Sequence, residues 1–124
     1  MLRVPRLLAG LVVVVLLATA CGSSAPAIAT FTREWDDGRV ETLELYDDGR
    51  VLMNHAGYID RTTLDPADVA RLRTALSSIV PATDPTAFPR LTLEPAGRTA
   101  VVVATDPGTT GALFLSLLDR HRLP

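Results

Sequence analysis

The histidines are the side chains of this sequence best suited to proton transfer at neutral pH. His55 precedes Asp60 by five residues, so the carboxylate could orient the imidazole across a turn while a serine acts as the nucleophile. The sequence places no serine beside them, because Ser77 and Ser78 fall in a predicted helix and no G-x-S-x-G turn occurs. We therefore predict no catalytic residues. The alternative is a small extracytoplasmic hydrolase or transferase that uses His55 with a carboxylate.

Acidic pairs and histidines are also potential metal ligands. Asp36 and Asp37 form one pair, and Asp47 and Asp48 form another. The pairs belong to turns at opposite ends of one predicted strand, about 20 Å apart, whereas calcium needs six to eight oxygens around one point. Two histidines provide too few nitrogen or sulfur ligands for zinc. We expect no metal site and no cofactor.

An aromatic residue followed by Asp-Asp-Gly-Arg occurs twice. Residues 35–39 read Trp-Asp-Asp-Gly-Arg and residues 46–50 read Tyr-Asp-Asp-Gly-Arg. The Asp-Gly pair is typical of tight hairpin turns, because glycine accepts a positive φ. Aromatic residues and arginine also dominate the energetics of protein interfaces. The predicted partner-binding residues are Trp35, Arg39, Tyr46 and Arg50. The alternative is that both aromatic rings only close the core.

These turns divide a stretch rich in β-favouring residues. Four segments are predicted to be strands of an antiparallel meander: residues 28–35, 40–46, 51–55 and 58–62. Alternation predicts that Leu43 and Leu45 share one face of the second strand, and that Val51 and Met53 share one face of the third. Leu52 points to the opposite side from Met53, which leaves the strand register open.

A helix follows with clear start signals. Asp65 is the predicted N-cap, Pro66 the first helical residue, and Asp68 stands where a capping box has its acidic partner. One apolar stripe at helical spacing is formed by Val69, Leu72, Leu76 and Ile79. Pro81 is expected to end this helix.

A proline-rich loop then leads to a second hairpin and a last helix. Residues 91–94 and 98–105 are the predicted hairpin strands. Residues 100–104 are apolar on both faces, which predicts a central position in the sheet. The last helix is expected to start at Thr109 or Thr110. Its apolar stripe is formed by Leu113, Phe114, Leu117 and Leu118, and the residues after it are expected to be solvated.

The resulting element order is β-β-β-β-α-β-β-α. It predicts an α+β fold, an antiparallel sheet made of a meander and a second hairpin with two helices on one face. The succession Tyr-x-Asp-Gly-Arg-Val, short strand, Leu-Asp-Pro-Ala-Asp-Val-Ala-Arg-Leu helix and hairpin resembles small uncharacterised secreted proteins and lipoproteins of high-GC Gram-positive bacteria. This resemblance covers most of residues 28–119. It implies an extracytoplasmic location and this fold, and it implies no activity.

The first residues are arranged like an export signal. Arg3 and Arg6 precede residues 7–20, an uncharged, mostly apolar run of 14 residues. A membrane-spanning helix needs about 20 residues, whereas the apolar region of a signal peptide has roughly 7–15. Residues 17–24 read Leu-Ala-Thr-Ala-Cys-Gly-Ser-Ser and resemble the lipobox of bacterial lipoproteins. The resemblance implies that Cys21 becomes the first mature residue and carries lipid, which anchors the chain to the membrane.

The lipobox pattern has one departure, because Ala18 stands where the family prefers leucine. Residues 18–20, Ala-Thr-Ala, also fit ordinary signal peptidase, so a secreted protein with an unmodified Cys21 is the alternative. The predicted organisation is a signal peptide over residues 1–20, the lipidated cysteine and a flexible tether over residues 21–27, and one domain over residues 28–124.

The net charge of the mature chain limits the kinds of partner it can bind. Removing residues 1–20 lowers the basic residues from 12 to 10 and leaves all 14 acidic ones, so the mature side-chain charge is −4. This argues against nucleic acid, because affinity for phosphates comes from clustered basic residues. We expect a non-catalytic lipoprotein outside the cytoplasm, with the membrane as one partner and an envelope protein as another. A carrier of a small apolar ligand between sheet and helices is a further alternative.

Overall fold

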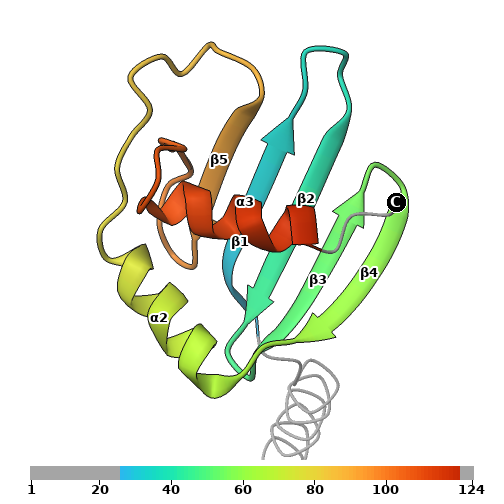
Figure 1. Cartoon of the computed structure of the whole chain (residues 1–124), viewed down its shortest axis with the longest axis vertical. Helices are drawn as coiled ribbons and strands as arrows, with labels where there is room; N and C mark the ends of the chain where they lie inside the picture. Colours follow the sequence, from blue (N-terminus) through green and yellow to red (C-terminus); the bar gives the residue numbers. More distant parts are fainter. Residues whose placement is uncertain (1–25, 121–124) are drawn as a thin grey trace, which may run out of the picture.

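Six strands form one antiparallel sheet in the order β4-β3-β2-β1-β5-β6, in a computed structural model that describes residues 26–120 (Figure 1). The strands are β1 (Ala27–Glu34), β2 (Val40–Tyr46), β3 (Arg50–His55), β4 (Tyr58–Thr63), β5 (Arg90–Pro95) and β6 (Val101–Val102), and the helices are α2 (Pro66–Leu76) and α3 (Thr110–Arg120). Both helices pack on one face, so the predicted α+β class and element order are confirmed. The predicted signal peptide and Cys21 lie outside the described residues. Ala27, expected in the tether, begins β1.

The repeated sequence motif is a repeated turn. Asp37 accepts hydrogen bonds from the backbone N–H (3.0 Å) and the Nε–H (2.7 Å) of Arg39. Asp48 accepts the same two bonds from Arg50, at 3.1 Å and 2.7 Å. The arginine of each turn is therefore clamped by the second aspartate, and the two turns separate β1 from β2 and β2 from β3.

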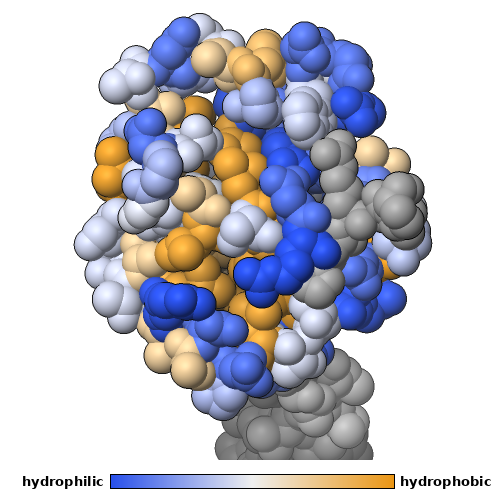
Figure 2. All heavy atoms as spheres, viewed as in Figure 1, coloured by the Kyte–Doolittle hydropathy of each residue, from blue (hydrophilic) through white to orange (hydrophobic). Residues whose placement is uncertain are grey.

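The core lies between the sheet and the helices. Leu43 and Leu45 are fully buried on one face of β2, and Val51 and Met53 on the same face of β3, as the alternation predicts. The pairing of Leu43 with Met53 settles the register left open by the sequence. The largest fully buried side chains are Phe31, Phe114, Leu43, Leu45, Met53, Leu91, Leu93 and Leu118. Apolar residues gather in the middle of the helix-bearing face, with hydrophilic residues around them (Figure 2).

The start of α2 is predicted correctly, but its capping is not. Asp65 is the N-cap and Pro66 follows it, yet the Asp65 side chain makes no capping hydrogen bond. The Asp68 carboxylate accepts a hydrogen bond from Arg71 at 2.6 Å in place of the expected capping box. The exposed Arg71, one turn along the helix, therefore binds the Asp68 carboxylate that the sequence predicted to cap the N-terminus of the helix.

The end of α2 is also earlier than predicted, at Leu76 and not at Pro81. The backbone N–H groups of Ser77 and Ser78 bond carbonyls three residues back, which closes the last turn. Thr110 of α3 donates its hydroxyl to the carbonyl of Ala75 at 2.7 Å, so a side chain of the other helix takes one of the terminal acceptors.

The valine-rich segment occupies an edge of the sheet, so its predicted central position is wrong. The strand expected over residues 98–105 is reduced to β6, which is the last strand in the sheet order. Residues 80–82 cover its outer side, where the N–H of Ala82 and the N–H of Ala104 each donate across the edge at 2.9 Å. Val103 is buried in the core. Residues 100–104 are therefore apolar because residues 80–82 cover the edge of the sheet and Val103 is buried, and not because the strand is central.

The last helix follows its sequence signals. Thr109 is its cap, because its Oγ1 accepts a hydrogen bond from the N–H of Ala112 at 3.3 Å. Phe114, Leu117 and Leu118 are buried against the sheet, and the rings of Phe31 and Phe114 stack at 5.3 Å. Helix α3 crosses the middle strands (Figure 1). Within residues 26–120, neither helix is long and apolar enough to cross a membrane.

The two ends of the sheet carry different parts of the chain. At one end, which we call the entry end, the described chain enters β1, and the turn over residues 46–50 lies beside it because Ala27 pairs with Tyr46. The other end, the far end, holds the turn over residues 35–39, the turn at residues 56–57 and the loop that precedes β5. Figure 1 shows the entry end at the bottom and the far end at the top.

The two matching glycines of the repeated turn should differ in their tolerance of alanine. Gly38 (φ +88°) and Gly49 (φ +91°) have the same backbone conformation, but a Cβ on Gly38 meets nothing within 4 Å, whereas one on Gly49 would lie 2.9 Å from the carbonyl oxygen of Leu64. The N–H of Leu64 also donates to the carbonyl of Gly49 at 2.9 Å, so this neighbour cannot move freely. We expect Gly38→Ala to lower the free energy of unfolding by about 1 kcal/mol, and Gly49→Ala by about 1 kcal/mol more. Urea denaturation measures both, and equal losses would contradict the close approach.

Candidate functional site

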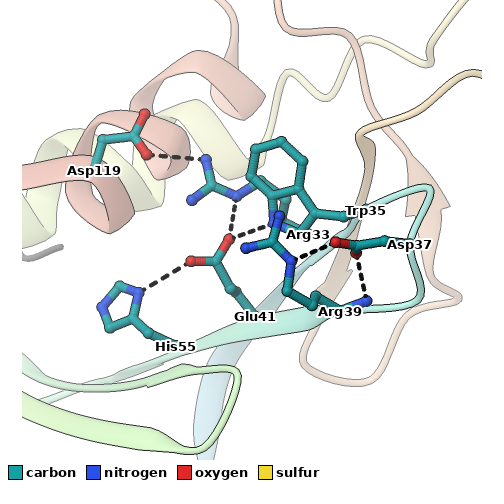
Figure 3. Close-up of polar contacts among 7 residues, drawn as sticks. All are labelled: Arg33, Trp35, Asp37, Arg39, Glu41, His55 and Asp119. Carbon is teal, nitrogen blue, oxygen red and sulfur yellow. Dashed lines mark hydrogen bonds and ion pairs between the residues drawn. The ribbon is translucent and has the colours of Figure 1, made fainter. Parts of the chain in front are cut away.

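A row of polar side chains crosses the core-facing side of the sheet at the far end. Arg33 of β1 pairs with Glu41 of β2, and Glu41 pairs with His55 of β3 (Figure 3). Arg33 and Glu41 are only 3% and 5% exposed, and the His55 side chain is 8% exposed. Charged groups this deeply buried require hydrogen-bonded partners.

Glu41 is the centre of this cluster. Its Oε2 accepts hydrogen bonds from Arg33 Nε (2.6 Å) and Trp35 Nε1 (2.9 Å), and its Oε1 lies 3.2 Å from His55 Nδ1. Burial opposes ionisation of the carboxyl, but the hydrogen bonds from these three side chains outweigh it and lower the pKa of Glu41 from 4.5 to about 2. Because an ionised carboxylate only accepts, Nδ1 of His55 carries the proton of this bond.

Arg33 extends the cluster to the helix layer. Its Nη1 donates to Oδ1 of Asp119 near the end of α3 at 2.9 Å. Burial lowers the pKa of Arg33, and the hydrogen bonds and charges of the two carboxylates raise it above its usual value. Asp119, which the sequence placed in a polar, solvated end, is half exposed and still holds α3 against β1.

Glu41 is the carboxylate beside Nδ1 of His55. Sequence reasoning proposed Asp60 for this position. On the neighbouring strand Tyr58 stands opposite His55, with ring centroids 6.4 Å apart, and Asp60 stands opposite Met53. The Nε2 of His55 is buried and has no hydrogen-bond partner within residues 26–120. Ser77, by contrast, donates its hydroxyl to a backbone carbonyl at the end of α2. The cluster therefore joins strands and a helix, and it presents no imidazole nitrogen to solvent.

Sequence reasoning missed Arg33, Glu41 and Asp119, although a signal was present for two of them. Arg33 alternates in phase with the buried Phe31, and Glu41 alternates in phase with the buried Leu43. A charged residue in phase with a buried face is expected either to be paired or to be a register device. Asp119 gives no such signal, because its partner lies 86 residues away in the sequence.

The predicted partner-binding residues form two pairs that lie apart. The guanidinium of Arg39 lies 5.3 Å from the centroid of Trp35, and that of Arg50 lies 4.9 Å from the centroid of Tyr46. Arg39 directly precedes β2 and Tyr46 ends it. The two residues are seven positions apart, an odd number, so they lie on opposite faces as well as at opposite ends of the sheet. Trp35 and Arg39 lie beside the buried cluster, and Tyr46 and Arg50 lie on the face without helices.

The second pair borders a surface hollow of about 290 Å³ at the entry end, on the open face of the sheet. Its lining includes Tyr46, Arg50, Leu52, Arg61 and Thr63. Tyr46 donates its hydroxyl to Glu44 on the same strand at 2.6 Å, and this hydrogen bond raises the pKa of the phenol. The hollow combines an apolar floor with two guanidinium groups.

A hollow between the helices has a volume of only about 40 Å³ and is lined in part by Leu72, Leu113 and Leu117. Pockets for small ligands commonly measure about 300–1,000 Å³. This hollow between the helices is therefore too small for an apolar ligand of that size.

Three of the four aspartates in the two turns form ion pairs with arginines. Asp37 pairs with Arg39 and Asp48 with Arg50, while Asp47 pairs with Arg73 of α2. Across residues 26–120, no three histidine, aspartate or glutamate side chains come together as metal ligands would. No family model, curated protein or solved structure matches this chain.

Replacement of Glu41 should test what the buried cluster contributes. Glu41→Gln keeps the size of the side chain but leaves the buried Arg33 without its closest countercharge, so we expect a loss of about 3 kcal/mol in the free energy of unfolding at pH 7. Because the folded pKa of Glu41 is depressed, its contribution is complete above pH 4.5 and is lost as the pH falls toward 2. The gap between wild type and variant should therefore close over that range in urea titrations.

Asp37→Asn is the matched control, because the ion pair of Asp37 with Arg39 is more than half exposed on both sides. We expect it to cost less than about 1 kcal/mol. A gap between wild type and Glu41→Gln that stays constant from pH 7 to pH 2 would contradict the ionised, buried state of Glu41.

Proposed function

We propose that this protein is a cell-envelope lipoprotein, held to the membrane by lipid on Cys21, whose domain binds an envelope protein and does not catalyse a reaction. The observation that carries the proposal is the placement of four of the five large apolar side chains that are exposed within residues 26–120, all but Val80. They lie at the end of the sheet opposite the one where the tether enters.

Four large apolar side chains are exposed at the far end. Their exposed fractions are 43% for Val40, 44% for Tyr58, 42% for Ile59 and 46% for Phe88. Val40 begins β2, Tyr58 and Ile59 begin β4, and Phe88 precedes β5, so all four belong to the far end. Val40 and Ile59 face the open side of the sheet and Tyr58 faces the helix side, so apolar side chains are exposed on both faces of this end. Exposed apolar area is typical of interaction surfaces when it is contiguous.

The same end carries aromatic rings paired with arginines. Arg39 lies over the ring of Trp35, and the guanidinium of Arg90 lies 4.8 Å from the centroid of Phe88. Glu34 adds an acidic group 3.5 Å from Arg90. Aromatic and arginine side chains are enriched in protein interfaces, where they combine apolar area with directional hydrogen bonds. This composition favours a protein partner.

The tether sets the orientation. Ala27, which starts β1 at the entry end, lies six positions after Cys21. A fully extended chain of that length spans about 20 Å, so the entry end stays close to the lipid anchor. The eight residues of β1 then carry the far end roughly 26 Å away, which directs its aromatic and apolar side chains from the membrane.

A binding role also fits the chemistry of the buried cluster. His55 is the titratable side chain best suited to general base catalysis, and its Nε2 is buried among neighbouring atoms. The alternative of a hydrolase or transferase would need this nitrogen to reach a substrate hydroxyl or water. The surface at the far end, by contrast, is accessible without any rearrangement.

The anchor is tested in the native host by mass spectrometry of the mature N-terminus. We expect a chain that begins at Cys21 and carries two acyl chains, recovered with the membranes. Cys21→Ala should abolish the modification and leave either an uncleaved precursor or released protein. Wild-type protein found in the culture fluid with a free Cys21 thiol would replace the lipoprotein proposal with the secreted alternative.

The binding surface is tested by photo-crosslinking in intact cells. A photoreactive residue at position 40 or 59 should give an adduct of defined mass, and one at Thr30, on the open face near the entry end, should not. Ile59→Asp should reduce the yield of the adduct formed from position 40, because it places a charge in an apolar contact. Equal yields from all three positions, or adducts unaffected by Ile59→Asp, would contradict a far-end interface.

A further inference from the structure

We propose that the hollow at the entry end docks on the phosphate groups of anionic membrane phospholipids through Arg50 and Arg61. This inference rests on the proposed function for one point only, the lipid anchor that brings the entry end to the membrane. It assigns the second half of the repeated motif to the membrane, while the first half remains at the far end.

Arg50 is held in place for such a contact. Its Nε–H and backbone N–H both bond Asp48, and its guanidinium lies over the ring of Tyr46. The Arg50 side chain remains 55% exposed, and no described residue accepts a hydrogen bond from its two Nη groups. A fixed guanidinium with free N–H groups loses little conformational freedom when it binds an oxyanion.

Arg61 provides the second cation. It stands opposite Leu52 in the β3–β4 pairing, and Thr63 stands opposite Arg50, so Arg50 and Arg61 are diagonal neighbours on one face. Diagonal cross-strand neighbours lie about 7–8 Å apart, within reach of one phosphate for two long side chains. Residues 26–120 provide no ion-pair partner for the Arg61 side chain, which leaves its charge uncompensated.

The floor of the hollow suits the boundary between headgroups and acyl chains. Leu52 and the ring of Tyr46 line it together with the two arginines. Tyrosine is enriched at membrane interfaces, because its ring is apolar and its hydroxyl is polar. Arginine can also lay its aliphatic stem along apolar surface while its charged group reaches phosphate.

The tether supplies proximity. Ala27 pairs directly with Tyr46, so the hollow borders the point at which the chain enters the sheet. An acyl anchor within about 20 Å holds the hollow at the membrane surface at a high effective concentration. A weak contact with headgroups is then sufficient to orient the domain.

Ion pairs cancel part of the negative charge near the hollow. Asp47 and Asp48 are paired with Arg73 and Arg50, whereas Glu44 only accepts a hydrogen bond from the neutral hydroxyl of Tyr46 and keeps its charge. The mature chain as a whole carries −4, which repels an anionic surface wherever no arginine faces it. An anionic membrane therefore selects the orientation in which Arg61 and Arg50 approach first.

The test uses a chain that begins at Gly22, which keeps every core residue, because the buried core lies within residues 29–118. Sedimentation with vesicles of phosphatidylglycerol and phosphatidylcholine should show binding that weakens with salt, and vesicles of phosphatidylcholine alone should bind far less. Arg61→Gln should reduce binding by about fivefold, because one basic residue near an anionic surface contributes about 1 kcal/mol. Arg50→Gln should have a similar effect.

Arg39→Gln is the matched control, because Arg39 occupies the same position of the same turn at the far end. It should leave vesicle binding unchanged. An equal loss for Arg39→Gln and Arg50→Gln, or no loss for Arg61→Gln, would overturn the proposal. Arg61→Gln breaks no ion pair within the described chain, so a folding defect does not confuse its result.

Inorganic phosphate serves as the second probe and separates the two sources of the ligand. Membrane docking predicts that millimolar phosphate shifts few resonances of the hollow and competes poorly with vesicles. Tight binding of free phosphate without vesicle binding would overturn the membrane assignment. The chain used with vesicles lacks Cys21, so the vesicle assay and the test of the lipid anchor are independent. A negative vesicle result would contradict the docking proposal only, and an unmodified Cys21 in the native host would contradict the anchor only.

Discussion

The ion pair between Arg33 and Glu41 is the interaction on which the far half of the structure depends. A buried ion pair is costly to desolvate and stabilises a fold only when its remaining donors and acceptors are bonded. Here Glu41 also accepts a hydrogen bond from Trp35 and lies beside His55, and Arg33 also donates to Asp119. Only Nη2 of Arg33 and Nε2 of His55 are left buried in this cluster without a hydrogen-bond partner within residues 26–120. The pair thereby connects β1, β2, β3 and α3 at the point where the apolar core ends. A register shift by one residue would move both charges to the open face and break every one of these bonds, so the cluster makes the native register much more favourable than its neighbours.

The repeated motif shows how one local structure can acquire two environments. Both turns use an aspartate to clamp an arginine beside an aromatic ring. The spacing between Arg39 and Tyr46 is odd, so the first aromatic ring lies beside buried charges and the second lies on the open face. The nitrogen of Trp35 is consequently bound by Glu41, whereas the ring of Tyr46 borders a hollow. The two copies of the motif therefore share the structure of their turns, and the length of β2 between them determines what each copy contacts.

What the sequence predicts well is local. Alternation identifies Leu43 and Met53 as core residues, and Asp65 and Thr109 mark the starts of the helices, because these signals act within a few residues. What it predicts poorly depends on partners distant in the chain. The edge position of β6 follows from the pairing of β5 with β1 and from coverage by residues 80–82. The Glu41 cluster likewise requires four elements to come together, so the sequence could at most mark Glu41 as a charge in phase with the core.

The geometry also gives the two arginine–aromatic pairs roles that need not compete. Their turns are separated by the length of β2, about 23 Å for its seven residues, and they face opposite sides of the sheet. If the proposed lipid on Cys21 is the only link to the membrane, the domain can rotate and turn its far end toward the membrane part of the time. A contact at Arg61 and Arg50 would restrict that rotation, and the rigid sheet would transmit the restriction to Trp35. Under both proposals, binding of a partner at the far end would gain from this orientation although the two surfaces share no residue, because less rotational freedom would remain to be lost on binding.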